Sequence, residues 1–293
     1  MKLLHTLLVG TALTLAVPAL AQTHDHEAMG HDMSQMESKN SDAKSMDMGG
    51  GHDEMTMQNA VKFTLSPDGN IQAGKTTKVT AKLTLLEDGS VLGERELKEA
   101  HTRKLHLLVV DPTLTDYHHI HPTPMANGEW SFDFTPLKNG QYRVWADVIP
   151  VATGKQEYIV ADIGMPSKEK ATIDQSTAMT STVDGYTFTL ALEGEPKAGA
   201  AVMGNVTVTK DGKPFTQLEP VMGAFAHVVG FTEDYKSVLH IHPMGKEPTS
   251  DAERGGPKLE FHIEPEKAGF VKLFAQVRID GKDVFAPFGI TVK

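Results

Sequence analysis

The stretch Lys78-Val79-Thr80-Ala81-Lys82-Leu83-Thr84-Leu85 alternates polar and apolar side chains. A period of two places the apolar groups on one face of an extended strand. Residues 205–209 and 141–148 alternate in the same way, and turn residues such as Ser66-Pro67-Asp68-Gly69 and Lys210-Asp211-Gly212 separate such runs. Long helical periodicity is missing from the sequence. The pattern therefore predicts short antiparallel strands joined by tight turns.

The strand pattern occurs twice along the chain, as an internal repeat. Val61-Lys62-Phe63-Thr64-Leu65 corresponds to Tyr186-Thr187-Phe188-Thr189-Leu190, and Phe132-Asp133-Phe134-Thr135-Pro136 corresponds to Phe261-His262-Ile263-Glu264-Pro265. A duplication of this length indicates two domains of the same fold. We expect an all-β chain with two tandem immunoglobulin-like or cupredoxin-like antiparallel β-sandwich domains, at 59–166 and 184–293, joined by a linker at 167–183.

A histidine motif is conserved between the two copies. His119-Ile120-His121-Pro122 recurs as His240-Ile241-His242-Pro243, and the same offset (240 − 119 = 121) separates the upstream histidines His106 and His227. Histidines at i and i+2 of a strand share a face, and a third from a neighbouring strand of a hairpin can complete a three-nitrogen metal pocket. The motif predicts two metal sites, formed by His106, His119 and His121 and by His227, His240 and His242.

Two other interpretations of these histidines remain open. The His-x-His pairs can be solvated surface residues that a recent duplication has left unchanged. His106 and His227 interrupt apolar runs, so each can be a core histidine that is hydrogen-bonded to the backbone. His101, His118 and His262 have no counterpart in the other copy, and we expect them to face solvent.

The N-terminus has the features of a secretory signal peptide. Lys2 precedes an apolar run from Leu7 to Val17, and Ala19-Leu20-Ala21 forms a small-x-small cleavage site. The apolar run is too short to span a membrane. We expect residues 1–21 to be removed, which would leave a protein of the periplasm without a membrane span.

Residues 22–58 combine methionine and histidine with many acidic, serine and glycine residues, and they include no aliphatic residue larger than alanine or methionine. Such a segment cannot bury a core, so we expect it to be disordered. Thioethers suit Cu(I) and Ag(I), and imidazoles suit Cu(II) and Zn(II). The alternative is a flexible acidic spacer. The candidate ligands of this tail are His24, His26, His31, His52, Met29, Met33, Met36, Met46, Met48, Met55 and Met57.

Composition excludes several classes of function. The chain has no cysteine, which rules out a blue-copper centre, a cysteine zinc finger and an iron–sulfur cluster,. The formal net charge is −10, and no stripe of Lys and Arg with interleaved aromatic residues is present, so we expect no nucleic-acid partner,. Asp147 aligns with Gln276, so the duplication repeats no general acid or base, and we expect no enzymatic activity.

The tail from Gln22 to Gln58 resembles that of exported copper-resistance and copper-efflux proteins of Gram-negative bacteria. The two His-Ile-His-Pro copies resemble small periplasmic domains found with such proteins. Together with the residues above, this resemblance implies a periplasmic protein that sequesters copper, with silver or zinc as alternatives, or delivers it to a periplasmic or membrane-bound efflux protein. The competing hypothesis is an interaction module that contacts a membrane efflux or sensor protein and holds no stoichiometric metal.

Overall fold

The computed structural model describes residues 59–241 and 243–293, apart from the side chain of His240. The regular structure of this part of the chain consists of antiparallel strands, with one short 3-10 helix. The alternation that predicts strands is present in β2 (Thr77–Leu85). There Val79, Ala81 and Leu83 are buried and Lys78 is exposed. Alternation along this strand therefore separates a core face from a solvated face.

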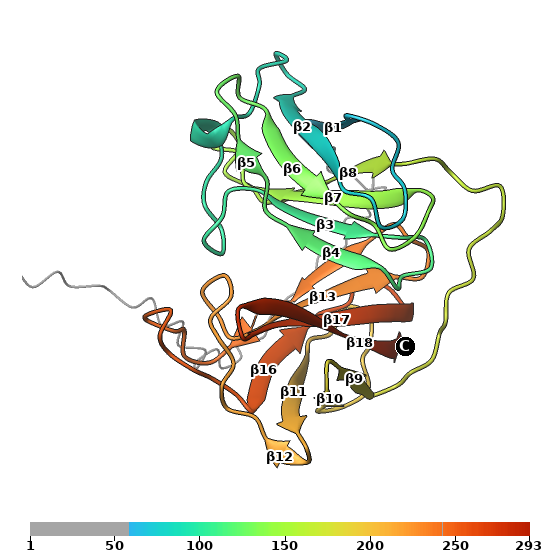
Figure 1. The fold of residues 1–293 in the computed structure, drawn as a ribbon, viewed down its shortest axis with the longest axis vertical. Coiled ribbons are helices and arrows are strands. Elements are labelled where there is room, and N and C mark those ends of the chain that lie inside the picture. Colours follow the sequence, from blue (N-terminus) through green and yellow to red (C-terminus); the bar gives the residue numbers. More distant parts are fainter. Residues whose placement is uncertain (1–58, 242) are drawn as a thin grey trace, which may run out of the picture. The chain divides into compact units, whose positions relative to one another are not determined.

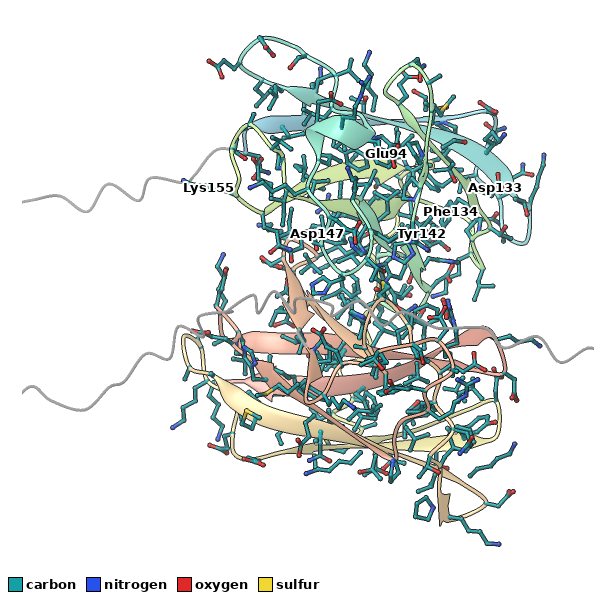
Figure 2. All side chains as sticks on the ribbon, turned by 90° about the vertical axis from the view of Figure 1, so that its left-hand side faces the viewer. Glu94, Asp133, Phe134, Tyr142, Asp147 and Lys155 are labelled. Carbon is teal, nitrogen blue, oxygen red and sulfur yellow. The ribbon has the colours of Figure 1, made fainter. Side chains whose placement is uncertain are left out.

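The first domain is a sandwich of two four-stranded sheets (Figure 1). Apolar side chains from both sheets form one core, which includes Phe134 and Tyr142, both labelled inside this domain in Figure 2. A 3-10 helix, η1 (Glu94–Glu96), lies in the connection between the sheets. One sheet has the order β1 (Val61–Pro67), β2, β6 (Trp130–Phe134), β5 (Thr123–Pro124), and the other has the order β4 (Tyr117–Ile120), β3 (His106–Val110), β7 (Tyr142–Val148), β8 (Glu157–Ile163).

The second domain repeats this plan around a core of its own. Its first sheet gains β9 at one edge, and β12 (Lys213–Pro214) pairs with β11. One sheet has the order β15 (Pro243–Met244), β16 (Lys258–Ile263), β11 (Val202–Lys210), β10 (Tyr186–Leu192), β9 (Thr180–Val183), and the other has the order β14 (Val238–Ile241), β13 (His227–Thr232), β17 (Gly269–Ile279), β18 (Lys282–Val292).

This strand order is that of an immunoglobulin-like sandwich. In chain order the strands of the first domain correspond to A, B, C, C′, D, E, F and G, with A-B-E-D in one sheet and C′-C-F-G in the other,. Tyr142 stands at the start of the F strand, and its hydroxyl bonds back to the carbonyl of Lys138 (3.2 Å), as in a tyrosine corner,. The prediction of two tandem antiparallel β-sandwich domains is confirmed.

Strands β3 and β7 are buried on both faces. In β3, Leu107 and Val109 point into the core of the first domain, whereas Leu108 and Val110 point into a separate apolar cluster. An apolar run without alternation is typical of a strand that is covered on both sides.

The second domain supplies the other half of that cluster. Both sandwiches belong to one compact unit, Thr56–Lys293. Residues at equivalent positions of the two C′-C-F-G sheets meet in the cluster, so that the repeats contact each other through the same face. The equivalent pairs are Leu108 and Val229, Val110 and Phe231, and Trp145 and Phe274.

A polar contact reinforces this contact between the domains. The hydroxyl of Tyr235 donates to the carbonyl of Val110 (2.6 Å), and the guanidinium of Arg143 lies 4.8 Å from the centre of the Tyr235 ring. The segment predicted as a linker also takes part, since Ile173 packs against the shared cluster and β9 joins the second domain. Among the helices in the described ranges, none has the length and apolar character needed to cross a membrane.

Candidate metal centre

His106 opens β3 and is buried between its neighbours. Its Nε2 atom lies 2.8 Å from the carbonyl oxygen of Ala100. A carbonyl can only accept, so Nε2 carries the proton and Nδ1 carries the lone pair. The local backbone therefore fixes the tautomer of His106 and directs a basic nitrogen away from that carbonyl.

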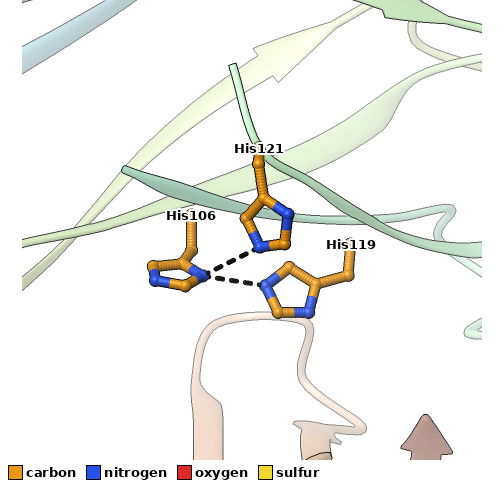
Figure 3. A group of neighbouring side chains, drawn as sticks. All are labelled: His106, His119 and His121. Atoms are coloured by element: carbon orange, nitrogen blue, oxygen red, sulfur yellow. Dashed lines mark hydrogen bonds between the residues drawn. The ribbon is translucent and has the colours of Figure 1, made fainter. Parts of the chain in front are cut away.

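His119 and His121 present their rings to this nitrogen (Figure 3). His119 lies on β4, which pairs with β3, and His121 follows the last residue of β4 on the same face. The Nε2 atom of each ring lies 3.2 Å from Nδ1 of His106. One ring nitrogen from each of the three histidines lies within 4.8 Å of the others. The hairpin thus brings His106, His119 and His121 together.

Gln276 from the second domain holds the ring of His119 in place. Its Oε1 atom lies 2.8 Å from Nδ1 of His119, and its Nε2 atom lies 3.2 Å from a carboxylate oxygen of Asp283. The carboxylate accepts from the amide nitrogen, which orients the amide oxygen towards His119. Nδ1 of His119 is therefore the donor, and its Nε2 atom carries a lone pair.

Two lone pairs consequently face each other at 3.2 Å, on Nδ1 of His106 and Nε2 of His119. Two acceptors cannot form a hydrogen bond, but they can share a cation. His121 adds a third nitrogen to the same point. Histidines that bind metals in proteins ordinarily donate their other ring N–H to an outer partner, which fixes their tautomer. Ala100 and Gln276 are such partners for His106 and His119. The arrangement can hold a transition metal through three neutral imidazoles.

The environment keeps two of these imidazoles neutral. Burial, followed by the neighbouring His121 and His106, lowers the pKa of His119 well below its usual value of 6.5. Burial, followed by the neighbouring His106 and Arg103, lowers the pKa of His121 to about 4. Both rings are therefore unprotonated at neutral pH, which is the state that a metal ligand needs.

A cavity of about 400 Å³ opens beside His121. Glu94, Glu99 and Arg103 line it together with the buried ring of Trp130. Lys104 lines it as well, so that two cationic side chains balance the two carboxylates. The cavity gives an ion access to His121.

The second copy reproduces part of this geometry. His227 is buried, and its Nε2 atom lies 3.2 Å from the carbonyl of Val221, as His106 lies against Ala100. The backbone of His240 pairs with Val229, as His119 pairs with Leu108. The side chain of His240, the whole of His242 and residues 1–58 lie outside the described part of the chain. The second site therefore stays a prediction, as do the tail ligands His24, His26, His31, His52, Met29, Met33, Met36, Met46, Met48, Met55 and Met57.

The expectation that His101 and His118 face solvent is wrong. Both are half-buried. His118 lies on the opposite face of β4 from His119, where its Nε2 atom is 2.9 Å from a carboxylate oxygen of Asp116 and its ring packs on Phe134. The ring of His101 is held between the two domains. His262 is exposed, as expected.

Sequence reasoning did not identify Gln276 as part of the first site. Its signal is an amide within the run Phe274-Ala275-Gln276-Val277, where the side chain is only 2% exposed. A buried polar side chain in an apolar strand needs a partner. Which partner it has could not be inferred, because His119 belongs to the other domain.

Comparisons with solved structures give matches that are remote. The D00-D0 domain of Intimin has 12% identity and a TM-score of 0.23, with 79% of this chain and 100% of that chain covered. MtrC from Shewanella baltica OS185 has 9% identity and a TM-score of 0.24, with 80% and 69% covered. Native alpha-2-macroglobulin of E. coli has 14% identity and a TM-score of 0.26, and the chain covers 14% of its length. Likeness at this level carries no argument about function.

No curated protein sequence matches the chain. A family model does match, and it does so twice, over residues 55–162 and over residues 181–293. These two segments coincide with the two sandwiches. The chain therefore belongs to the family described as Domain of unknown function (DUF8832).

Proposed function

We propose that this protein binds a transition metal, and copper in particular, at His106, His119 and His121, and that it sequesters the ion or delivers it to a partner. One observation supports this above the others. The carbonyl of Ala100 and the amide of Gln276 leave two ring lone pairs 3.2 Å apart, beside a third ring nitrogen. Without an ion the two lone pairs repel each other, whereas a bound metal ion accepts both of them.

The donor set favours copper among the divalent metals. Three imidazoles suit Cu(II), Zn(II) and Ni(II), and the affinity of a nitrogen site is ordinarily highest for Cu(II). The tail at 22–58 adds thioethers, which suit Cu(I) and Ag(I), to further imidazoles,. Silver and zinc are the alternative ions. The signal-peptide pattern of residues 1–21 supports a periplasmic location for this function,.

The proposal assigns different tasks to the two parts of the chain. The tail would collect ions quickly and weakly through many ligands. The sandwich would hold one ion firmly at a defined site, whose cavity beside His121 gives access for exchange with an efflux protein. The proposed activity is binding and transfer, without catalysis.

The proposal is tested by copper binding to the full-length protein. Substitution of both His119→Ala and His121→Ala should remove one Cu(II) per chain and the corresponding nitrogen-coupled signal in electron paramagnetic resonance. His262→Ala is the matched control, because this histidine is exposed and lies outside the site. An unchanged copper stoichiometry and spectrum in the double variant would refute the metal site and favour the interaction module.

A further inference from the structure

His101 lies on a tight turn that is strained in both of its central residues. Ala100 and Arg103 exchange backbone hydrogen bonds of 2.8 and 3.0 Å, and His101 and Thr102 between them have φ angles of 49° and 65°. Left-handed backbone is unfavourable in a residue other than glycine, because Cβ approaches the following carbonyl oxygen. In the equivalent turn of the second domain, Met222 occupies the first of these positions and Gly223 the second. Glycine adopts a left-handed backbone without strain.

The turn carries the imidazole of His101 to a histidine of the other domain. The ring centre of His101 lies 5.6 Å from that of His227, with the ring planes at 79°, and 6.2 Å from that of His106. The Nε2 atom of His227 faces the carbonyl of Val221 and therefore carries the proton, so that Nδ1 carries the lone pair,. His101 thus lies between His106 of the three-histidine site and the ring of His227.

A cavity of about 610 Å³ adjoins this pair of histidines. The residues that line it include His101, His227, Met222 and Met244. Two imidazoles and two thioethers around one cavity form a softer donor set than the three imidazoles at His106. Met244 is 48% exposed, so this wall of the cavity can be reached from solvent.

We propose that His101 and His227 form a second metal position across the domain boundary, with the thioether of Met222 as the third donor. The site takes a soft monovalent ion, Cu(I) or Ag(I), because such ions accept few ligands and favour thioether with imidazole. This position is separate from the proposed site at His106, His119 and His121 and does not require that site to be occupied. It competes for Nδ1 of His227 with the predicted site of His227, His240 and His242. The strain of the turn has a function in this arrangement, since it holds His101 towards the second domain.

The test is a titration of the full-length protein with Ag(I), followed by the ring nitrogen resonances of ¹⁵N-labelled histidine. Site-resolved signals separate this position from silver that binds elsewhere. We expect the ring nitrogens of His101 and His227 to shift together at one equivalent of bound ion. His101→Asn should abolish the shift of His227, because asparagine tolerates the left-handed backbone but supplies no imidazole. Met222→Leu should weaken silver binding at His227 at least tenfold, whereas Met165→Leu, at an exposed position, should not change it.

The controls separate this inference from the proposed function. Zn(II) should shift His106, His119 and His121 in the parent protein and in His101→Asn alike. The second position is refuted if His101 and His227 do not respond to Ag(I), or if His101→Asn leaves the response of His227 intact. A missing zinc response at His106, with a silver response at His227, would refute the three-histidine site and leave the second position standing.

Discussion

Gln276 of the second domain accepts a hydrogen bond of 2.8 Å from the ring of His119 of the first domain. The first candidate site is thus not contained within one sandwich. Its three nitrogens come from the β3–β4 hairpin, but the partner that sets the orientation of one ring comes from β17. The contact between the domains is therefore part of the site.

Replacing Gln276 by alanine should weaken metal binding at the first site while the fold is kept. Loss of an outer partner of a metal-ligating histidine ordinarily costs 10- to 100-fold in affinity, and we expect about that range here. A competition titration with a chromophoric chelator measures it. Gln217→Ala is the control, because Gln217 is exposed and its side chain donates to the neighbouring carbonyl of Thr216. Equal affinity in the two variants would contradict a role for Gln276.

The stability of the metal-free protein should fall as the pH is lowered from 6.5 towards 4. The pKa of His121 is about 4 in the folded chain, and that of His119 is also well below 6.5. In this window the unfolded chain binds more protons than the folded chain, so the free energy of unfolding decreases with decreasing pH. A loss of up to about 3 kcal/mol is expected for His121. Urea unfolding at pH 7 and pH 4 with a chelator measures it, and His121→Gln should show a flatter dependence.

Removal of the Tyr142 hydroxyl should destabilise the first domain without changing the metal site. This hydroxyl donates to the buried carboxylate of Asp116, accepts from the amide of Lys138 at 3.1 Å and lies 3.2 Å from the carbonyl of Lys138. Tyr142→Phe should lower the free energy of unfolding by about 1–3 kcal/mol, because a buried acceptor loses its donor. Denaturant unfolding gives this value. Metal affinity should stay within twofold, because Tyr142 lies at the far end of β7 from the residue that pairs with His106.

Phe231→Ala should affect both stability and metal binding. Phe231 is fully buried in the cluster shared by the domains, where its ring centre lies 5.3 Å from those of Tyr117 and Trp145. A cavity of this size costs about 3–5 kcal/mol and should loosen the position of Gln276. Phe188→Ala, in the core of the second domain, is the control of equal size. It should cost similar stability but leave metal affinity unchanged, and equal metal affinity in both variants would argue against coupling through the domain contact.

Deletion of residues 24–57 should lower the copper stoichiometry and leave the thermal transition of the sandwiches nearly unchanged. The composition of this segment predicts that it buries no apolar core,. Metal analysis together with calorimetry tests both expectations. A large loss of thermal stability would show that the segment packs on the domains and is not a free collector.

The sequence was sufficient to predict the fold because the relevant signals are local. Alternation in residues 78–85 is enough to define a strand with one buried face, and the turn residues set its length. The hairpin from His106 to His121 is likewise local, so the grouping of its three histidines follows from spacing. The domain contact is not local, and no periodicity specifies which surface it uses.

A signal for the domain contact was nevertheless present. Residues 107–110 are apolar without alternation, which requires cover on both faces of the strand,. The expectation that His101 is solvent-facing is wrong for the same reason, since the second domain occupies what would be solvent for an isolated sandwich. The partners of His101 and Gln276 could not be predicted, because they depend on how the two faces meet.

A contact in which equivalent residues, such as Leu108 and Val229 or Val110 and Phe231, share one apolar cluster resembles the isologous interface of a homodimer, where both subunits use the same surface,. In a homodimer every substitution is made twice, and the two halves stay identical. Within a single polypeptide each half mutates alone, and the tether keeps its partner at high effective concentration. The first domain can therefore have Asp147 at the position of Gln276 in the second domain, and His101 at the position of Met222, while the two domains stay in contact. Covalent fusion of the two halves thus allows residues at equivalent positions of the two domains to diverge independently.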